Sequence, residues 1–500
     1  MVKPQAKIEF GDFQTPIALS QQICDCLRQL GLAPASLIEP TCGQGNLLLT
    51  AWQTFPDLQQ TLGIELNLDY VNRLVQQLVT LPQSETIKII HDDFFKRDWA
   101  TMLANLPEPI LIIGNPPWVT NSALGLLNGQ NLPEKNNFQN HSGLEALTGK
   151  SNFDISEWML LQLLEAMADK TATLAMLCKT SVARKVLRYA WQKSLKIAPA
   201  HLYRIDSAHY FEAAVDAGLL VIQTHPTDSH HHCNVYPTLE SPTHVTSFGL
   251  RQQELISDLP HYDQWQHLAG TSEYIWRSGL KHDCAKIMEL NAIDDNYTNG
   301  LGETYQLEPT FIYPLLKATG LAKSRNPLPQ HFVIVTQTAI NQNTDHIGQS
   351  APKTWAYLQQ HEAWFAKRKS VVYQNKSSFA MFGIGDYTFV PWKVAISGLH
   401  KQLNFAVIAP YNDKPVLFDD TCYFIGCQNQ AEADYLAMLL NSRPAQEFLM
   451  ARIFWDNKRP ITAAILKQLS LLAVAKELGL ELQFRQFQSL PAGKQLNLLI

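Results

Sequence analysis

Residues 36–46 decide the fold, and they read SLIEPTCGQGN. A short apolar run ends at Glu39, and a helix-like run from Asn46 to Trp52 follows the turn. Two glycines one residue apart allow a tight turn and let a ligand approach the backbone. This turn between a strand and a helix predicts a ligand-binding edge in an open α/β sheet.

Strand-like and helix-like runs alternate through the first half of the chain. Strands are expected at 36–39, 61–65, 86–90, 110–113, 173–177 and 219–223, and helices at 46–52, 70–78 and 155–167. The alternation predicts βαβ units around a mostly parallel, buried sheet, which is an α/β fold. The pattern weakens near Thr224, so we expect one domain at 1–240 and a second, of mixed α+β character, at 241–500. In the second domain, strands are expected at 332–336, 371–373 and 405–408, and a helix at 431–440.

The composition, 46% hydrophobic and 17% charged, excludes a disordered chain. No run approaches the roughly 20 apolar residues that cross a bilayer, and residues 1–13 lack the apolar core of a signal peptide. Eight cysteines are scattered along the chain, and we expect all of them to be reduced. These features predict a soluble, cytoplasmic protein with no membrane partner.

The net charge of −5 argues against a general polycation, although one region is locally basic. Eight Lys and Arg residues, and no Asp or Glu, lie between residues 170 and 204. Arg184 and Lys185 belong to this region and are candidates for contacts with nucleic-acid phosphates. An ordinary solvated helix face is the alternative.

Two acidic residues follow later strands. Glu65 lies 20 residues after Gly45, where an acidic group suits a ribose diol. Asp93 can accept from an adenine amino group while Phe94 packs on the ring. Residue Leu48 stands where a dinucleotide fingerprint has its third glycine, which disfavours NAD and favours S-adenosylmethionine. An ordinary tight turn, an exposed acid and a core phenylalanine are the alternatives.

Residues 111–118 read LIIGNPPW, an apolar strand that ends in Asn115, Pro116, Pro117 and Trp118. An exocyclic amine on a base is a weak nucleophile, because its lone pair is delocalised into the ring. Its two N–H groups can donate hydrogen bonds to the Asn115 side-chain oxygen and the Pro116 carbonyl. These hydrogen bonds return electron density to the nitrogen. The prolines stiffen the backbone, and Trp118 offers a face for stacking. A proline turn with a packed tryptophan is the alternative.

In their order, these motifs resemble those of the gamma-class N6-adenine DNA methyltransferases of Type II restriction–modification systems. The resemblance covers nearly the whole chain and rests on residues 14–16, 39–45, 63–65, 93–94 and 115–118, with a further segment at 149–153 before a long helix. Trp118 is a departure, since the family more often has Tyr or Phe there, and the larger indole should still stack.

The resemblance implies a Rossmann-like methyltransferase domain with S-adenosylmethionine as its cofactor. Thr15 would hold the carboxylate of the cofactor. The other cofactor contacts would come from Glu39, Cys42, Gly43 and Gly45 at the methionine moiety, Glu65 at the ribose, and Asp93 and Phe94 at the adenine. The target base would be held by Asn115, Pro116, Pro117 and Trp118, with Phe211 stacked on its opposite face. A plain core phenylalanine is the alternative for Phe211.

The resemblance also implies that the second half is a DNA target-recognition domain, since residues 383–394 and 456–462 resemble segments of the family's specificity domain. The target base lies inside a stacked duplex, and its extrusion costs a few kcal/mol that DNA contacts must offset. Cations interleaved with aromatic residues could supply these contacts, namely residues 367–369, Lys376, Lys393, Lys458 and Arg459. A folded domain with an ordinary basic surface is the alternative.

The sequence therefore predicts a site-specific methyltransferase that modifies N6 of a flipped-out adenine in double-stranded DNA. We expect a monomer that protects DNA in a restriction–modification system, with a cognate restriction endonuclease acting separately. The alternatives are the same chemistry on guanine N2 of RNA or glutamine of proteins, a binding module without transfer, and a fused restriction–modification enzyme. No metal is expected, because consecutive side chains in the run 230–233 point in different directions.

Overall fold

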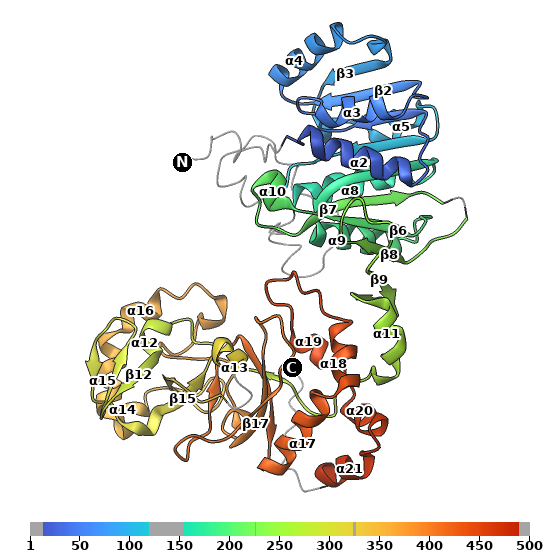
Figure 1. The fold of residues 1–500 in the computed structure, drawn as a ribbon. Helices are drawn as coiled ribbons and strands as arrows, with labels where there is room; N and C mark the ends of the chain where they lie inside the picture. Colours follow the sequence, from blue (N-terminus) through green and yellow to red (C-terminus); the bar gives the residue numbers. More distant parts are fainter. Residues whose placement is uncertain (1–13, 120–153, 226, 324–326, 490–500) are drawn as a thin grey trace. The chain divides into compact units, whose positions relative to one another are not determined.

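The computed structural model describes residues 14–119, 154–225, 227–323 and 327–489. Residues 1–13 and the segment 149–153, which entered the sequence interpretation, lie outside these ranges. The chain divides into two compact units, Met1–Leu259 and Pro260–Ile500 (Figure 1).

Within the described residues, the first unit is built on a ten-stranded sheet of order β10-β9-β8-β6-β7-β5-β4-β1-β2-β3 (Figure 1). Its strands are β1 (Ser36–Glu39), β2 (Gln60–Glu65), β3 (Ile87–His91), β4 (Ile110–Gly114), β5 (Ala172–Lys179), β6 (Ala200–Ile205), β7 (Ala217–Gln223), β8 (His232–Tyr236), β9 (Thr246–Arg251) and β10 (Glu254–Ile256). Strands β3, β2, β1, β4 and β5 are parallel, and β7 pairs antiparallel with β5. The predicted α/β fold with a mostly parallel sheet is thereby confirmed.

Helices cover both faces of this sheet. They are α2 (Ile17–Gln29), α3 (Asn46–Thr54), α4 (Leu68–Val79), α5 (Trp99–Ala104), α8 (Ile155–Ala166), α9 (Thr180–Gln192) and α10 (Ser207–Phe211). The next helix, α11 (Leu259–Trp265), begins at the last residue of this unit and lies otherwise in the second unit. Leu37, Leu111 and Ile113 share a buried core with α2 and α3. Alternate strand residues point to the opposite face, where α8 contacts α5 and α9.

The predicted elements of the first half are found within a few residues of their expected ends. Strand β1 has the expected bounds, and α3 begins at Asn46 after Gly45 takes a left-handed conformation. The side chain of Asn67 caps α4 by accepting from Asp69 N at 3.0 Å. Asp154 caps α8 by accepting from Ser156 N at 3.1 Å. Such caps satisfy N–H groups that have no partner inside the helix.

The first unit continues beyond the boundary expected at residue 240. Strand β8 pairs parallel with β6, and β9 and β10 extend the same sheet as antiparallel neighbours. Residues 246–256 therefore belong to the large sheet, and the unit ends at Leu259. The change of pattern near Thr224 reflects a switch from helical crossovers to hairpins within one sheet.

The second unit is a mixed α+β structure with two sheets among the described residues, of orders β11-β20-β17-β18 and β14-β13-β12-β16-β15-β19. The strands are β11 (Arg277–Ser278), β12 (Glu289–Ile293), β13 (Asn296–Asn299), β14 (Thr304–Tyr305), β15 (Ile312–Leu316), β16 (His331–Ile334), β17 (Trp392–Ser397), β18 (Ala406–Ile408), β19 (Leu417–Phe418) and β20 (Cys422–Cys427). The helices are α12 (Ala285–Met288), α13 (Ala318–Lys323), α14 (Ile347–Ser350), α15 (Pro352–Gln360), α16 (Glu362–Ala366), α17 (Gln430–Leu440), α18 (Arg443–Met450), α19 (Ala463–Leu466), α20 (Leu471–Glu477) and α21 (Glu481–Ser489).

One predicted strand of this unit is wrong. Residues 371–373 form a short 3₁₀ helix instead. Val371 and Val372 are 71% and 43% exposed, so their β-branched side chains do not pack on a neighbouring strand as strand propensity requires. The guanidinium of Arg368 lies 3.8 Å from the centre of the Tyr373 ring and holds this turn. The other three predicted elements correspond to β16, β18 and α17.

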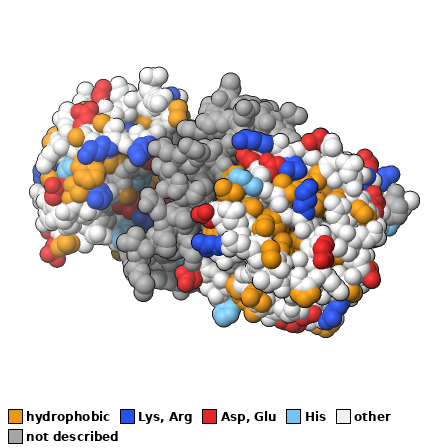
Figure 2. All heavy atoms as spheres, turned by 90° about the horizontal axis from the view of Figure 1, so that it is seen from above, with side chains coloured by type: hydrophobic (Ala, Val, Ile, Leu, Met, Phe, Trp, Pro, Cys, Tyr) orange, Lys and Arg blue, Asp and Glu red, His pale blue; other side chains and the backbone are white. Residues whose placement is uncertain are grey.

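All eight cysteines are buried and unbridged, as expected. No helix of the described part of the chain is long and apolar enough to span a bilayer. Acidic and basic side chains are intermixed over much of the face that Figure 2 shows, in line with the small net charge.

Candidate functional site

Parallel strands bring the predicted site residues to one edge of the large sheet. Glu39 ends β1, Glu65 ends β2, Asp93 follows β3, and Asn115 comes directly after β4. These four strands are neighbours in the order β4-β1-β2-β3, so their carboxyl ends meet. In open α/β sheets this edge is where ligands bind.

The turn after β1 requires its glycines. Gly43 and Gly45 have φ of +51° and +84°, which side chains rarely adopt. A Cβ on Gly43 would lie 2.5 Å from Gln14 Oε1, and a Cβ on Gly45 would lie 2.5 Å from Leu74 Cδ1. The backbone of the turn is therefore closely enclosed by the side chains of Gln14 and Leu74.

Two residues that precede α2 hold this turn. Gln14 Oε1 accepts a hydrogen bond from Gln44 N at 2.9 Å. The carbonyl of Thr15, a buried residue, accepts from Asn46 Nδ2 at 3.0 Å. Thr15 therefore lies beside the turn. Sequence reasoning assigned no role to Gln14, although it belongs to the motif 14–16 that was part of the resemblance.

Glu65 joins the turn to the next strand. Its Oε2 accepts from Gly43 N at 2.8 Å, and its Oε1 accepts from Asn67 N at 2.7 Å. The carboxylate is therefore fixed in orientation at the end of β2. Each of its oxygens has further lone-pair capacity for a ligand.

Glu39 is buried at the start of the same turn. Its Oε2 is buried and has no hydrogen-bond partner among the described residues. Burial raises the pKa of Glu39 well above its usual range; the N–H of Leu48 opposes this shift, and the nearby Glu65 adds to it. A buried carboxyl oxygen of this kind is costly unless a bound group satisfies it. Cys42 packs its sulfur against Gly63, where an added Cβ would lie 3.0 Å from Sγ.

Asp93 and Phe94 take different positions. Asp93 Oδ1 accepts from Phe95 N at 3.0 Å, and its Oδ2 lies 3.6 Å from Lys96 Nζ. The ring of Phe94 is 5% exposed and packs on Trp99, with ring centres 4.7 Å apart. Asp93 thus lies at the edge of the sheet, whereas Phe94 packs mainly as a core residue.

The Asn115–Trp118 segment begins beside the glycine turn. A Cβ on Gly114, the residue before Asn115, would lie 3.5 Å from Pro40 Cδ in that turn. Asn115 and Pro117 are half-buried, and Pro116 is buried. The two motifs that the sequence predicted as cofactor-binding and base-binding therefore follow neighbouring strands, with Gly114 beside Pro40.

The two aromatic residues predicted to sandwich the target base touch one another. The rings of Trp118 and Phe211 are 5.2 Å apart at 72°, an edge-to-face contact. Trp118 Nε1 also donates to Leu177 O at 3.4 Å. Since bases stack about 3.4 Å apart, a base between two rings needs about 7 Å between their planes. The two rings are close enough to act together, but they must separate to admit a base.

Lys179, the last residue of β5, holds the Asn115–Trp118 segment in place by a hydrogen bond to its main chain. Lys179 Nζ donates to Trp118 O at 3.0 Å and to Asp154 Oδ2 at 2.5 Å. The side chains of Lys179 and Asp154 are only 20% and 7% exposed. Asp154 also caps α8, so one pair links the segment, β5 and α8. Sequence reasoning missed this pair, because nothing in the local pattern brings the two residues together.

The predicted basic residues of the first unit lie on α9. Arg184 is half-buried and Lys185 is exposed. Lys185 Nζ lies 2.6 Å from the buried carboxylate of Glu157 on α8. The region is therefore less basic than its sequence indicates, because buried carboxylates from another helix partly neutralise it.

Among the basic residues of the second unit that were predicted to contact DNA, the prediction is wrong for Lys393. It is 1% exposed, and its ammonium donates to Val390 O at 2.6 Å and Val416 O at 3.0 Å. A buried ammonium with two carbonyl partners does not reach a phosphate. Lys458 and Arg459 are exposed.

Lys393 should make folding pH-dependent. Burial lowers its pKa to about 7, whereas an unfolded lysine titrates near 10.4. Between these values the unfolded chain binds one more proton, so the free energy of unfolding rises with pH by up to about 1.4 kcal/mol per unit. Denaturant titrations of the wild type and Lys393→Met at pH 7.5 and 9.5 should show a stability difference that shifts by about 2 kcal/mol in favour of the wild type. Equal differences at both pH values would contradict this assignment.

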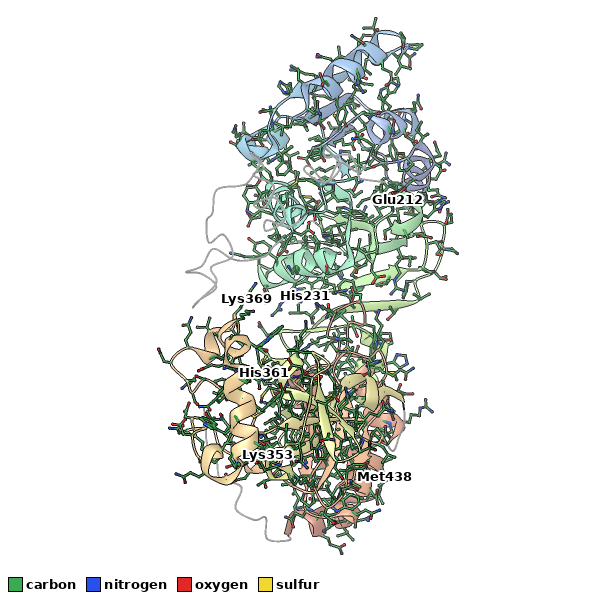
Figure 3. All side chains as sticks on the ribbon, turned by 90° about the vertical axis from the view of Figure 1, so that its left-hand side faces the viewer. Glu212, His231, Lys353, His361, Lys369 and Met438 are labelled. Atoms are coloured by element: carbon green, nitrogen blue, oxygen red, sulfur yellow. The ribbon has the colours of Figure 1, made fainter. Side chains whose placement is uncertain are left out.

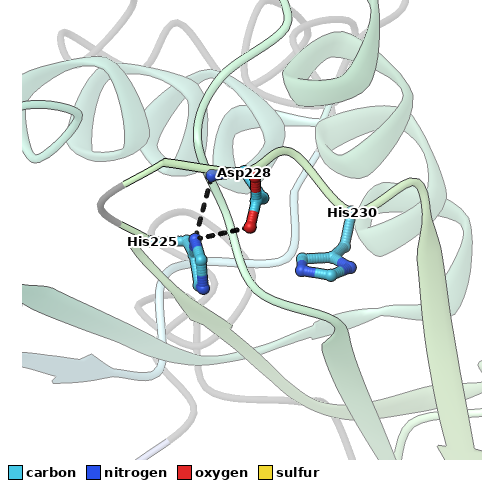
Figure 4. A group of neighbouring side chains, drawn as sticks. All are labelled: His225, Asp228 and His230. Atoms are coloured by element: carbon cyan, nitrogen blue, oxygen red, sulfur yellow. Dashed lines mark hydrogen bonds and ion pairs between the residues drawn. The ribbon is translucent and has the colours of Figure 1, made fainter.

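Three side chains in the loop after β7 form the cluster shown in Figure 4. Ligand atoms of His225, Asp228 and His230 lie within 4.8 Å of one another. His225 Nδ1, however, accepts from Asp228 N at 2.9 Å and from Thr227 N at 3.3 Å. A cation would therefore compete with two N–H groups for one lone pair. Of the run 230–233, the structure brings His230 into this cluster, and Cys233 is buried elsewhere in β8.

Comparison with known proteins identifies a close relative over the whole length. The chain is 43% identical over 473 residues to the Type II methyltransferase M.NspV of Nostoc sp., covering 94% of this chain and 98% of that protein. No family model matches the chain.

One solved structure shows a similar fold at low sequence identity, and others match parts of the chain. The Type IIL restriction–modification enzyme MmeI, solved in complex with DNA, has a TM-score of 0.51 and 14% identity, over 90% of this chain and 64% of that chain. A type I restriction–modification methyltransferase subunit from Streptococcus thermophilus has a TM-score of 0.32 and 16% identity, over 51% of this chain and 52% of that chain. The extent of identity with M.NspV shows that the chain belongs to the family of Type II methyltransferases.

Proposed function

We propose that the protein transfers a methyl group from S-adenosylmethionine to N6 of a flipped-out adenine at a specific site in double-stranded DNA. The observation that carries this proposal is that the glycine turn after β1 and the Asn115–Trp118 segment after β4 follow neighbouring parallel strands at the same edge of the sheet. The family membership and the fold shared with MmeI, a protein solved with DNA, support it. The first unit would carry out the transfer, and the second would recognise the target.

The residues at the glycine turn fit S-adenosylmethionine. The buried Glu39 oxygen would accept from its amino group, Thr15 would hold its carboxylate, and Glu65 would accept from its ribose hydroxyls. Asp93 would accept from its adenine amino group. The cofactor would supply an electrophilic methyl group on a sulfonium centre.

The Asn115–Trp118 segment would activate the target amine. The Asn115 side-chain oxygen and the Pro116 carbonyl would each accept one N–H of the exocyclic amine, which directs its lone pair toward the methyl donor. Trp118 and Phe211, after separating, would cover the two faces of the base. The proton can leave after methyl transfer, so these residues need no general base.

Labelled S-adenosylmethionine tests the substrate class. The protein is incubated with double-stranded DNA, RNA or a protein extract, and the modified nucleoside or residue is identified by mass spectrometry. We expect N6-methyladenine in DNA. Label in RNA guanine or protein glutamine would instead support the same chemistry on another substrate, and absence of transfer with retained cofactor binding would support a binding module.

The Lys179–Asp154 pair should position the base-binding segment. Asp154→Asn keeps an acceptor for the cap of α8, since Asn caps helices well, but removes the charge that holds Lys179. We expect Asp154→Asn and Lys179→Met to lower kcat by about tenfold or more through misplacement of the segment, with little change in the KM for S-adenosylmethionine. Lys179→Arg, which keeps the charge, should recover part of the loss.

Glu108→Gln provides a matched control. Glu108 pairs with Lys170 at 3.6 Å at the amino ends of β4 and β5, the opposite edge of the sheet. This variant should keep the wild-type kcat. If Asp154→Asn and Glu108→Gln behave alike, the pair near Trp118 has no positioning role.

We further propose that the protein acts in the cytoplasm as a monomer and protects DNA from a cognate restriction endonuclease that is a separate chain. Family membership supports the link with restriction–modification. Sequencing of modified bases in a host that expresses the protein, followed by challenge with the endonuclease, would test it. Cleavage of the modified sites would contradict the protective role.

A further inference from the structure

The loop between β7 and β8 brings two imidazoles and a carboxylate together (Figure 4). One ligand atom of each of His225, Asp228 and His230 lies within 4.8 Å of the others. We propose that these three side chains bind a divalent transition-metal ion of the Zn²⁺ type. Imidazole nitrogens with a carboxylate oxygen suit such an ion, whereas Mg²⁺ and Ca²⁺ prefer oxygen ligands. No metal was expected from the run 230–233, which supplies only His230 to this cluster.

The cluster lies at the edge of the large sheet opposite to the proposed methyl-transfer site. Strand β7 is antiparallel to β5, so Gln223 at the end of β7 pairs with Thr173 near the start of β5. The glycine turn and the Asn115–Trp118 segment, in contrast, follow the carboxyl ends of β1 and β4. The metal would therefore stabilise the loop and take no part in methyl transfer, and the inference does not depend on the proposed function.

Main-chain hydrogen bonds fix both histidines on one neighbouring segment. His225 N donates to Lys196 O at 2.9 Å, and His230 N donates to Ile197 O at 3.0 Å. Thr224, the residue before His225, forms an isolated antiparallel bridge with Ile197. The two imidazoles are thus carried by backbone positions that are held near one another before an ion binds. This arrangement limits the entropy that is lost on binding.

The main chain of the loop also sets the tautomer of His225. Its Nδ1 accepts from Asp228 N at 2.9 Å and from Thr227 N at 3.3 Å. Nδ1 therefore carries the lone pair and Nε2 carries the proton. The same Nδ1 lies 3.8 Å from Asp228 Oδ2. An ion bound at Nδ1 would displace the two N–H groups, and both belong to exposed residues, so they can donate to water instead.

Small side-chain movements would complete the site. Zinc–ligand bonds of about 2.1 Å place tetrahedral ligand atoms about 3.4 Å apart, so atoms that lie up to 4.8 Å apart must approach one another. The Asp228 side chain is 66% exposed and has room to turn. Water would take the fourth position, as at zinc sites with three protein ligands. The ion should therefore exchange with solvent and be removable by a chelator.

Metal binding by the full chain, without a polyhistidine tag, tests the inference. The protein is treated with a chelator and titrated with Zn²⁺ by calorimetry. It is also titrated with Co²⁺, which absorbs visible light far more strongly in tetrahedral than in octahedral sites. We expect one Zn²⁺ per chain and a tetrahedral Co²⁺ spectrum. Free Zn²⁺ at about 100 times the Kd should raise the Tm by about 5 °C.

His230→Gln and Asp228→Asn each remove one proposed ligand. We expect each substitution to weaken Zn²⁺ binding by about 10²-fold or more, since even the loss of a group that only orients a ligand costs 10- to 100-fold. His231→Gln is the matched control, because His231 is an exposed histidine of the same loop (Figure 3) that does not belong to the cluster. This variant should bind Zn²⁺ as the wild type does.

Loss of binding in the two ligand variants, with binding retained in the control, supports the inference. Zn²⁺ binding that all three variants keep would place the ion elsewhere and overturn it. Equal weakening in all three would indicate non-specific capture by exposed histidines and overturn it too, as would a folded wild type that binds no Zn²⁺. Thermal melting without metal verifies folding, and Asp228→Asn, with its exposed side chain, decides if His230→Gln does not fold.

Discussion

Asn115→Ala is expected to lower kcat for methyl transfer by about 10²- to 10³-fold, the loss typical of one preorganised polar contact to a reacting group. The substitution would remove one of the two acceptors proposed for the target amine, so the nitrogen would keep its lone pair in the ring. Affinity for S-adenosylmethionine should stay within about twofold, because the glycine turn, Glu39 and Glu65 are unchanged. Single-turnover transfer of a labelled methyl group and equilibrium dialysis with the cofactor measure the two quantities.

Asn105→Ala is the control for this experiment. Asn105 ends α5, and its Nδ2 donates to Thr101 O at 2.9 Å, before β4 begins. It lies at the amino end of the same strand whose carboxyl end carries Asn115. This variant should keep full activity. Unchanged transfer by Asn115→Ala would refute the role assigned to the side chain.

Glu65→Ala should weaken S-adenosylmethionine binding by about 10²-fold or more. The carboxylate would accept from the ribose hydroxyls, and hydrogen bonds to charged groups contribute about 1.5 to 3 kcal/mol each. The substitution also leaves Gly43 N and Asn67 N without the acceptor that now fixes them at 2.8 and 2.7 Å, so the glycine turn should lose its shape. Calorimetric titration with the cofactor measures the loss.

Asn67→Ala separates these two effects. It removes the cap of α4, a cost of about 1 kcal/mol, but keeps the Glu65 carboxylate and both backbone N–H groups. We expect a lower melting temperature with nearly wild-type cofactor affinity. If Asn67→Ala weakens the cofactor as much as Glu65→Ala does, local stability rather than ribose binding explains the result.

Local sequence predicted the residues that a strand carries to its end. Glu39, Glu65, Asp93 and Asn115 each follow a short apolar run, and parallel strands bring such positions to one edge whatever their order in the sheet. The βα turn was predictable for a related reason, because glycine adopts the positive φ of Gly43 and Gly45 without the strain that a side chain brings. The placement of these residues at one edge is therefore predictable without a structure.

Contacts between distant elements were not predictable in this way. The Lys179–Asp154 pair depends on how β5 and α8 pack, and the support that Gln14 gives the glycine turn depends on where the chain enters α2. The prediction that Lys393 contacts DNA is wrong. Its charge suggested a DNA contact, but β17 is buried from Lys393 to Ser397, and the Lys393 ammonium donates to two carbonyls.

The strand predicted at residues 371–373 is wrong for a third reason. Their composition favours a strand, but strand propensity reflects packing against a neighbour as much as the backbone itself. Arg368, which lies over Tyr373 and donates to carbonyls of the adjoining segment, holds the backbone in a turn. The contacts of the Arg368 side chain therefore override the strand propensity of Val371 and Val372.

The edge-to-face contact between Trp118 and Phe211 has a consequence for energetics. In the protein without DNA, the Trp118 and Phe211 rings shield one another from water. A nucleotide that enters between them would therefore cover aromatic surface that was not solvated before. Insertion of the proposed flipped base would then exchange one aromatic contact for two and would contribute less hydrophobic free energy than insertion between two separated rings. The affinity for the duplex must then come from other contacts. A duplex that lacks the nucleobase at this position should therefore bind about as tightly as the intact one.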